Sequence, residues 1–494
     1  MTEARTPTVD PALERRTVMA VSLLAVAAAV LRGIGLNGGL WVDEMYAVNL
    51  SVSRSLWQIL TTFDGDGQHP LFAVLAHLSS AVLGQSAWSA RLPAVLFGVA
   101  SVPMLYLLGR RVTTRAEALM AATLLTVSYH HVWFSQNARG YSMLAFFAIL
   151  ATYALVRGLR EGGWRWFVLY AVAVALGAYT HLTMVFMSVA QFVVVAVWML
   201  AGRERRKGPL WLPVLGGFTL AAALTLLLYA PIIDQVVWWF LYRPSNFAGI
   251  STPGWALGEA LRVLRTGLGA GPTVLAAGVL LALGTVSWLR RSPVVLALFV
   301  APGLLTLGGA LLARGTMYPR FFFYLAGFAV LLAVRGLTLA GAAVARVLVR
   351  RDPGARRRLT VRIAAGLTAL GVAVSLSSLR YNYRFPKQDF GGALAYLQSS
   401  RAADEPVVLV GATDYAYQDW YREPWPVVED VAQLDAAAGD AAHYWLLYTF
   451  PRYIELETPE LMARIREDCG ERRVFDGTVG DGDVVVCRMK GRET

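Results

Sequence analysis

The chain has 494 residues, of which 56% are apolar, and its mean hydropathy is +0.50. A water-soluble protein of this length would divide into domains with polar surfaces, whereas apolar runs long enough to span a bilayer recur here. The 45 Lys and Arg against 33 Asp and Glu give a net charge of +12. Most of these cations lie between apolar runs. This pattern is typical of cytoplasmic loops that lie beside anionic membrane lipids, and it argues against a nucleic-acid partner.

The apolar runs predict a polytopic α-helical membrane protein with about eleven transmembrane helices. In chain order the predicted spans cover 17–36, 88–109, 116–134, 140–157, 165–180, 182–201, 209–230, 272–290, 293–313, 319–338 and 362–380. The first run is long enough to remain in the membrane as an anchor, and it has no convincing cleavage site for a signal peptide.

The apolar segment from Pro70 to Gly84 is short for a span, and we interpret it as a helix at the outer interface. This choice places every basic segment on the cytoplasmic side, together with the N-terminus: 110–115, 158–165, 203–207, 290–291 and 346–362. The outer side then holds 37–87, 135–140, 181, 231–271, 314–320 and everything after Tyr381.

The composition changes near residue 380, which predicts two parts. Residues 1–380 would form the transmembrane module, with its first outer loop at 37–87, and residues 381–494 a small extracytoplasmic α/β domain. Within that domain we expect helices at 388–400 and 458–468 and strands at 407–410, 444–448 and 484–487. Cys469 and Cys487 could form a disulfide there if the domain faces an oxidising compartment.

Two adjacent carboxylates, Asp43 and Glu44, follow the first predicted span. At a membrane surface such a pair could supply a general base or hold a divalent cation. The alternative is structural, because Asp43 could cap a helix beginning near Met45 and Glu44 could favour its dipole.

Two histidines, His69 and His181, also fall in the predicted outer segments. His69 could bind a phosphate, orient a carboxylate or share a metal with Asp66, and His181 has the same ambiguity. A lone histidine is more often a helix cap or a satisfied polar residue.

Arginines at two predicted outer helix ends contradict the usual charge bias. Arg139 lies in Ser135–Tyr141, beside Gln136 and Asn137, and Arg320 follows Pro319. An anionic ligand would explain both cations, and snorkelling to the surface is the structural alternative.

The series of motifs resembles the GT-C superfamily of lipid-linked glycosyltransferases, and most closely its family 39 branch with the protein O-mannosyltransferases. The lipid A aminoarabinose transferase is a more distant relative. The resemblance covers roughly residues 17–400 in order. The segments that carry it are Trp41–Glu44, Gln68–Leu71, Ala90–Pro93, Leu107–Arg111, Ser135–Tyr141, Tyr179–His181, Pro319–Phe321 and Lys387–Phe390.

The resemblance implies a polyprenyl-phosphate sugar as donor, bound in a cavity open to the membrane and the outer phase. It also implies that Asp43 is the acidic catalytic residue, with Glu44 beside it. We therefore expect an inverting glycosyltransferase acting on a glycan, lipid or protein acceptor. The residues expected to bind substrate are His69, Gln136, Asn137, Arg139, Tyr141, His181 and Arg320.

Many relatives of this type carry a second acid in the second outer loop, where this chain has Gln136 and Asn137. The resemblance therefore leaves open whether a divalent cation is used. Two other functions fit the same features: a transporter or flippase of lipid-linked sugars, and an inactive relative that only binds a glycolipid. Polar residues gathered at one face, with no repeated half, argue against a transporter.

Overall fold

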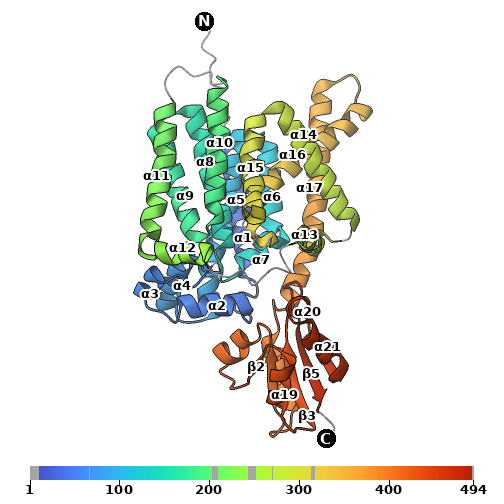
Figure 1. The fold of residues 1–494 in the computed structure, drawn as a ribbon. Helices are drawn as coiled ribbons and strands as arrows, with labels where there is room; N and C mark the ends of the chain where they lie inside the picture. Colours follow the sequence, from blue (N-terminus) through green and yellow to red (C-terminus); the bar gives the residue numbers. More distant parts are fainter. Residues whose placement is uncertain are drawn as a thin grey trace.

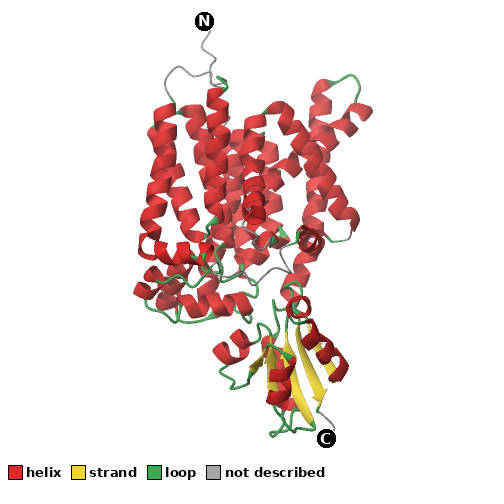
Figure 2. Cartoon of the chain, in the orientation of Figure 1, coloured by secondary structure: helices red, strands yellow, loops and turns green. Residues whose placement is uncertain are grey.

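A computed structural model describes residues 11–65, 67–202, 210–242, 252–269, 271–312 and 318–491. In Figure 1 long helices run side by side, and a smaller domain is attached at one end of the bundle. Figure 2 shows that, within the described ranges, the strands belong to the smaller domain.

Nine helical segments of the described residues are long and apolar enough to cross a membrane. They are α1 (Pro11–Gly33), α5 (Ala87–Val112), α8 (Tyr141–Glu161), α10 (Thr183–Leu200), α11 (Trp211–Tyr229) with α12 (Ile233–Leu241), α14 (Gly271–Arg291), α15 (Pro293–Leu312), η3 (Pro319–Leu325) with α16 (Ala326–Leu348), and α17 (Pro353–Arg384). The helical membrane class is confirmed, and the expected number of spans is too high.

Two predicted spans differ from these nine. The run 116–134 is divided into α6 (Arg115–Val127) and α7 (Tyr129–Ser135), because Ser128 leaves the helical conformation and its hydroxyl accepts the His131 N–H. The run 165–180 forms α9 (Trp164–Thr180), which at 17 residues is shorter than the others. It still packs between α8 and α11, as part of the bundle (Figure 1).

Three short helices cross the end of the bundle nearest the smaller domain: α2 (Val42–Ser51), α3 (Leu56–Thr61) and α4 (Pro70–Leu83) (Figure 1). Pro70 begins α4, as predicted, because proline fits the first helical position, where its missing N–H costs nothing. The segment 231–271 was expected to be a loop. Its described part is largely helical, in α12 and in α13 (Pro253–Leu268).

Basic residues gather at the other end of the bundle. Arg110 and Arg115 form ion pairs with Glu14 of α1, at 3.5 and 3.1 Å, and Arg111 pairs with Glu161 at 3.0 Å. The ends of α5 and α8 and the beginning of α1 therefore share one side of the bundle. The predicted basic loop 203–207 lies outside the described residues.

The smaller domain is a five-stranded mixed sheet in the order β2-β1-β3-β5-β4. β1 runs parallel to β2 and β3, while β5 is antiparallel to β3 and β4. The strands are β1 (Val407–Val410), β2 (Val427–Val428), β3 (His443–Tyr448), β4 (Cys469–Phe475) and β5 (Val484–Lys490). Cys469 and Cys487 are joined by a disulfide with their Cα atoms 5.5 Å apart.

Helices cover both faces of this sheet. Alternate residues of β1 point to opposite faces, so that Val407 and Leu409 join one core and Val408 and Val410 the other. The first core includes α18 (Phe390–Ser400), and the second includes α19 (Val431–Ala438), α20 (Pro451–Glu457) and α21 (Pro459–Asp468). A short π-helix, η4 (Tyr415–Trp420), contacts α2. The helix α17 continues past residue 380, where the domain boundary was predicted, to Arg384.

Candidate active site

The segment between α1 and α5 brings Asp43 against Arg320. The helix α2 begins at Val42, so that Asp43 lies inside the first turn and does not cap the helix. Its Oδ2 atom is 2.7 Å from Nη1 of Arg320, and the two side chains are 23% and 29% exposed. Pro319 begins η3, and the Arg320 guanidinium lies 4.4 Å from the centre of the Tyr318 ring. The Asp43 carboxylate is thus charge-paired and still open to a ligand.

Glu44 follows Asp43 in the sequence but has a different environment. It is fully buried, and Arg91 of α5 donates to both of its carboxylate oxygens, at 2.7 and 2.6 Å. The Ala138 N–H donates at 2.6 Å, and the Lys387 ammonium lies 3.5 Å away. Burial alone would raise the pKa of Glu44, but Arg91 and Lys387 lower it to about 2. A carboxylate bound in this way cannot contact a substrate, which argues against the expected catalytic role for Glu44.

Arg91 of α5 also connects this buried cluster to the segment between α1 and α2. Its guanidinium also donates to the carbonyl oxygens of Leu36, Gly38 and Gly39, at 2.7 to 2.9 Å. One arginine therefore holds both Glu44 and the chain that leads from α1 to α2. The Glu44 cluster, meaning Glu44, Arg91 and Lys387, determines where Asp43 lies.

His69 and Arg139 meet beside Asp43. The Gly140 N–H donates to Nδ1 of His69 at 2.8 Å, so the proton of the neutral ring is on Nε2. That atom lies 3.3 Å from Nη2 of Arg139, whose Nη1 is 3.5 Å from the Asp43 carbonyl oxygen. A side chain at Gly140 would meet Nδ1 of His69 at 2.6 Å, so only glycine allows this approach.

His181 repeats this arrangement from the turn between α9 and α10. The Thr183 N–H donates to Nδ1 of His181 at 3.2 Å, which leaves the ring proton on Nε2. This Nε2 is buried and makes no hydrogen bond within the described part of the chain. The two histidine rings lie edge to face, 5.0 Å apart, and the ring of Tyr141 lies 4.9 Å from that of His69.

Both histidines remain neutral at physiological pH. Burial, followed by the charges of Arg139 and Arg320, lowers the pKa of His181 to about 3. Burial and the same arginines also lower the pKa of His69 well below its usual range. The result is a group of side chains with N–H donors, two cationic and two neutral, that lie close enough to interact electrostatically. We call Arg139, Arg320, His69 and His181 the anion pocket, because such a group favours an anionic oxygen ligand.

The side-chain amides of Gln136 and Asn137, between α7 and α8, have hydrogen-bond partners within the protein. Nε2 of Gln136 donates to the carbonyl oxygens of Arg32 and Ile34 at the end of α1, at 3.2 and 2.7 Å. Oδ1 of Asn137 accepts from the Trp41 indole at 3.2 Å. These contacts join the segment after α7 to the end of α1 and to Trp41, and they argue against the expected substrate-binding role of Gln136.

These residues do not fit a carboxylate metal site. Among the described residues, no three His, Cys, Asp or Glu side chains gather as metal ligands would. Nδ1 of His69 accepts a backbone N–H, and Asp43 is paired with Arg320. Asp66, the predicted partner of His69, lies outside the described residues. We therefore assign no step of the chemistry to a metal.

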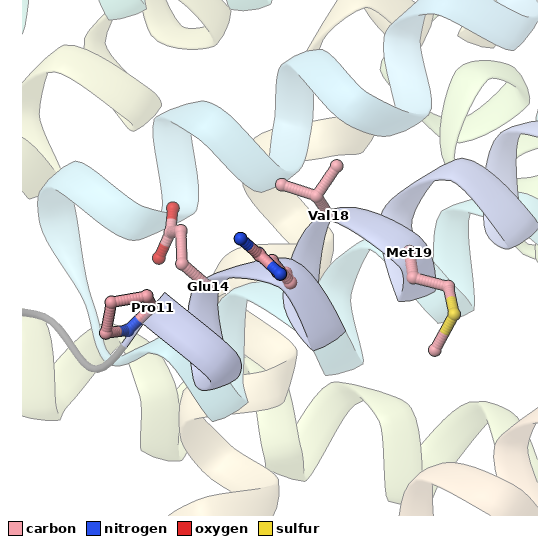
Figure 3. A pocket seen from close by; sticks show the side chains of 5 residues that line it. Pro11, Glu14, Val18 and Met19 are labelled. Carbon is pink, nitrogen blue, oxygen red and sulfur yellow. The ribbon is translucent and has the colours of Figure 1, made fainter.

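A surface depression elsewhere is not part of this site. It is lined by Pro11, Glu14, Arg15, Val18 and Met19 at the beginning of α1 (Figure 3). Since α1 has 23 residues, this end lies roughly 30 Å from the outer segments. A much smaller pocket, lined in part by Gly67, His69 and Arg139, adjoins the anion pocket.

Sequence reasoning did not assign roles to Arg91, Lys387 or Gln388, although all three lie in the motifs quoted above. Arg91 gave a signal, because a cation within an apolar run needs a buried partner. Lys387 and Gln388 gave none, since their partners are hundreds of residues away along the chain.

The overall architecture is that of a GT-C-like membrane protein. The archaeal oligosaccharyltransferase AglB from Archaeoglobus fulgidus, solved with an inhibitory peptide and a dolichol-phosphate, aligns with a TM-score of 0.54 at 11% identity, covering 92% of this chain and 71% of that chain. This likeness shows a shared fold. ArnT from Cupriavidus metallidurans in the apo state aligns over 97% of this chain and 98% of that chain, with a TM-score of 0.48 and 17% identity.

Residues 68–239 match the family of dolichyl-phosphate-mannose-protein mannosyltransferases, which confirms the resemblance found in the motifs. A curated relative, the putative mannosyltransferase YkcB of Bacillus subtilis (strain 168), is 27% identical over 123 residues. That alignment covers 25% of this chain and 17% of the relative's length. The matched family segment includes His69, Arg139, Tyr141 and His181 of the candidate site.

Proposed function

We propose that this chain is a glycosyltransferase that moves a sugar from a polyprenyl-phosphate donor to an acceptor hydroxyl. The observation that carries the proposal is the placement of Asp43, a partly exposed carboxylate, against the anion pocket. A base beside a group of phosphate-binding donors is what displacement of a lipid phosphate requires. The family match and the fold shared with a protein solved with dolichol-phosphate support this choice of donor.

In this mechanism the donor phosphate lies in the anion pocket and the acceptor hydroxyl approaches Asp43. The carboxylate takes the hydroxyl proton as the acceptor oxygen bonds to the anomeric carbon. The bond from that carbon to the phosphate oxygen breaks, and its electron pair leaves with the polyprenyl phosphate. One displacement with one base inverts the anomeric configuration. Arg139 and Arg320 stabilise the charge that develops on the leaving group.

The ion pair between Asp43 and Arg320 forms when no donor is bound. A phosphate bound by Arg320 competes with the carboxylate for the guanidinium. Donor binding therefore weakens the pair and leaves Asp43 free to accept a proton. The neutral histidines contribute N–H groups without adding positive charge, so that the product phosphate can still leave.

We place the candidate site on the extracytoplasmic face, with the sheet domain on the same side and the N-terminus in the cytoplasm. The cations around Glu14 lie at the other end of the bundle, as expected for segments beside anionic cytoplasmic lipids. The Cys469–Cys487 disulfide supports an oxidising compartment for the sheet domain. Acceptors on this face include glycans, lipids and proteins.

Replacement of His181 is expected to weaken donor binding. In His181→Phe the aromatic contacts are kept and the Nε2 proton is lost, so one hydrogen bond to a charged oxygen disappears. Such a bond contributes about 1.5–3 kcal/mol, equivalent to a roughly 10- to 150-fold higher Kd for polyprenyl phosphate. His181→Gln, which retains an N–H donor, should recover part of the affinity. An unchanged Kd in the phenylalanine variant would exclude His181 from the anion pocket's ligand contacts.

The proposed function is tested with purified protein in liposomes and a labelled polyprenyl-phosphate sugar. We expect transfer of label to an added extract of cell-envelope acceptors. Movement of the labelled lipid between leaflets without product would indicate a flippase. Saturable binding without either would indicate an inactive glycolipid-binding protein, and both of these results would overturn the proposal.

A further inference from the structure

Two consecutive residues at the entry to the sheet domain reach into the candidate site. Lys387 and Gln388 follow α17 and precede α18, and both side chains are buried. Their partners are the residues on either side of Asp43: Gln388 binds Val42, and Lys387 binds Glu44. The entry to the sheet domain thereby contacts both neighbours of the proposed catalytic carboxylate, the backbone of Val42 and the side chain of Glu44.

The Gln388 amide uses its hydrogen-bonding groups fully. Its Oε1 accepts the Val42 N–H at 3.0 Å. Its Nε2 donates to Oγ1 of Thr449, at 3.0 Å, and to the carbonyl oxygen of Gly482, at 3.0 Å. The opposite orientation of the amide would set two donors against each other at Val42. The side chain therefore connects the sheet domain to the first turn of α2 in one defined geometry.

Lys387 supplies the second connection. Its ammonium lies 3.5 Å from Oε1 of Glu44 and donates to the Gln136 carbonyl oxygen. The ammonium also lies 5.6 Å from the centre of the Trp133 ring. The same Glu44 oxygen accepts the Ala138 N–H, one residue before Arg139. One cluster thus relates the base, the anion pocket and the sheet domain to one another.

We infer that Gln388 is a positioning residue for Asp43, and that the sheet domain is a working part of the active site through it. The inference rests on the proposed function. Gln388 contacts the Val42 backbone and not the reacting atoms, so it acts on the angle and depth at which Asp43 meets the acceptor hydroxyl. A base displaced by about 1 Å can lose roughly 100-fold in rate.

The test compares Gln388→Ala with Gln433→Ala, a matched change at an exposed glutamine of the same domain. In the transfer assay, Gln388→Ala should lower kcat by about 10- to 100-fold. Its KM for the donor should stay within about twofold of the wild type, because the anion pocket is untouched. Thr449→Val removes one partner of Gln388 and should give a smaller loss of kcat. Gln433→Ala should behave as the wild type.

A second measurement separates positioning from a general loss of folding. Hydrogen exchange of the peptide containing Val42 should accelerate in Gln388→Ala, while the strands of the sheet domain keep their protection. A kcat within about twofold of the wild type, or a rise in KM without a fall in kcat, would overturn the inference. So would lost protection throughout the sheet domain, since that result would mean a structural role.

The transfer assays of the wild type, Asp43→Asn and Gln388→Ala together distinguish a failure of the proposed function from a failure of this inference. If the wild type transfers no sugar, or if Asp43→Asn transfers it normally, the proposed function is wrong. If both behave as proposed and Gln388→Ala equals the wild type, the inference alone is wrong, and the sheet domain does not control the base.

Discussion

Asp43→Asn is expected to reduce sugar transfer by about 100- to 10,000-fold, the usual contribution of a general base. The amide has nearly the shape of the carboxylate but cannot take the acceptor proton. Donor binding should persist or improve, because the Asp43 carboxylate no longer competes with the phosphate for the Arg320 guanidinium. The measurement is single-turnover transfer from a labelled polyprenyl-phosphate sugar, together with the donor Kd.

Stability provides the control for this variant. Asp43 and Arg320 are both partly exposed, and such pairs contribute at most about 1 kcal/mol, so that the unfolding midpoint should hardly change. Asp64→Asn is a matched change, since the Asp64 carboxylate pairs with Arg54 at 2.5 Å and not with a member of the anion pocket. Asp64→Asn should transfer normally. Near-normal transfer by Asp43→Asn would exclude Asp43 as the base.

Glu44→Gln should have the largest effect on stability, of about 3–5 kcal/mol, because it leaves the Arg91 and Lys387 cations buried without their carboxylate. Arg91 is 3% exposed and Glu44 is 0% exposed, so water cannot replace the lost partner. We expect a clear fall in the thermal unfolding midpoint in detergent and the loss of transfer with it. The two acidic neighbours are thus separable: one variant loses activity alone, and the other loses activity and stability.

The pH dependence of stability is expected to follow from the ionisation of Glu44. The folded-state pKa of Glu44, about 2, lies below its ordinary value of 4.5. Its stabilisation is therefore fully present above about pH 4.5 and is lost as the pH falls towards 2. The wild type should lose stability over this range more steeply than Glu44→Gln. Equal acid sensitivity of the two proteins, or an unchanged midpoint for Glu44→Gln at neutral pH, would contradict this account.

The helical membrane class could be predicted from the sequence, because a span of about 20 apolar residues is a local property. The beginning of α4 at Pro70 was predictable for the same reason, since proline acts on its own backbone. Errors arose where one residue interrupts an apolar run. Ser128 ends α6 and starts α7 through its own hydroxyl, so one predicted span became two short helices.

The candidate site was predictable in its residue types but not in its pairing. The positions of Asp43, Arg139, His69, His181 and Arg320 were identified from outer segments and motifs. Their roles depend on partners far along the chain, such as Arg320, which lies 277 residues from Asp43.

Only the tertiary structure decided which of the two adjacent acids is open and which is buried. Neighbouring residues on a helix point in different directions, so Asp43 and Glu44 meet different surroundings. The sequence by itself determined a helical membrane protein with polar groups at one end. The fold decided that Arg91 and Lys387 enclose Glu44, and that Gln388 links the sheet domain to Val42, because burial and hydrogen bonding depend on contacts that no local pattern records.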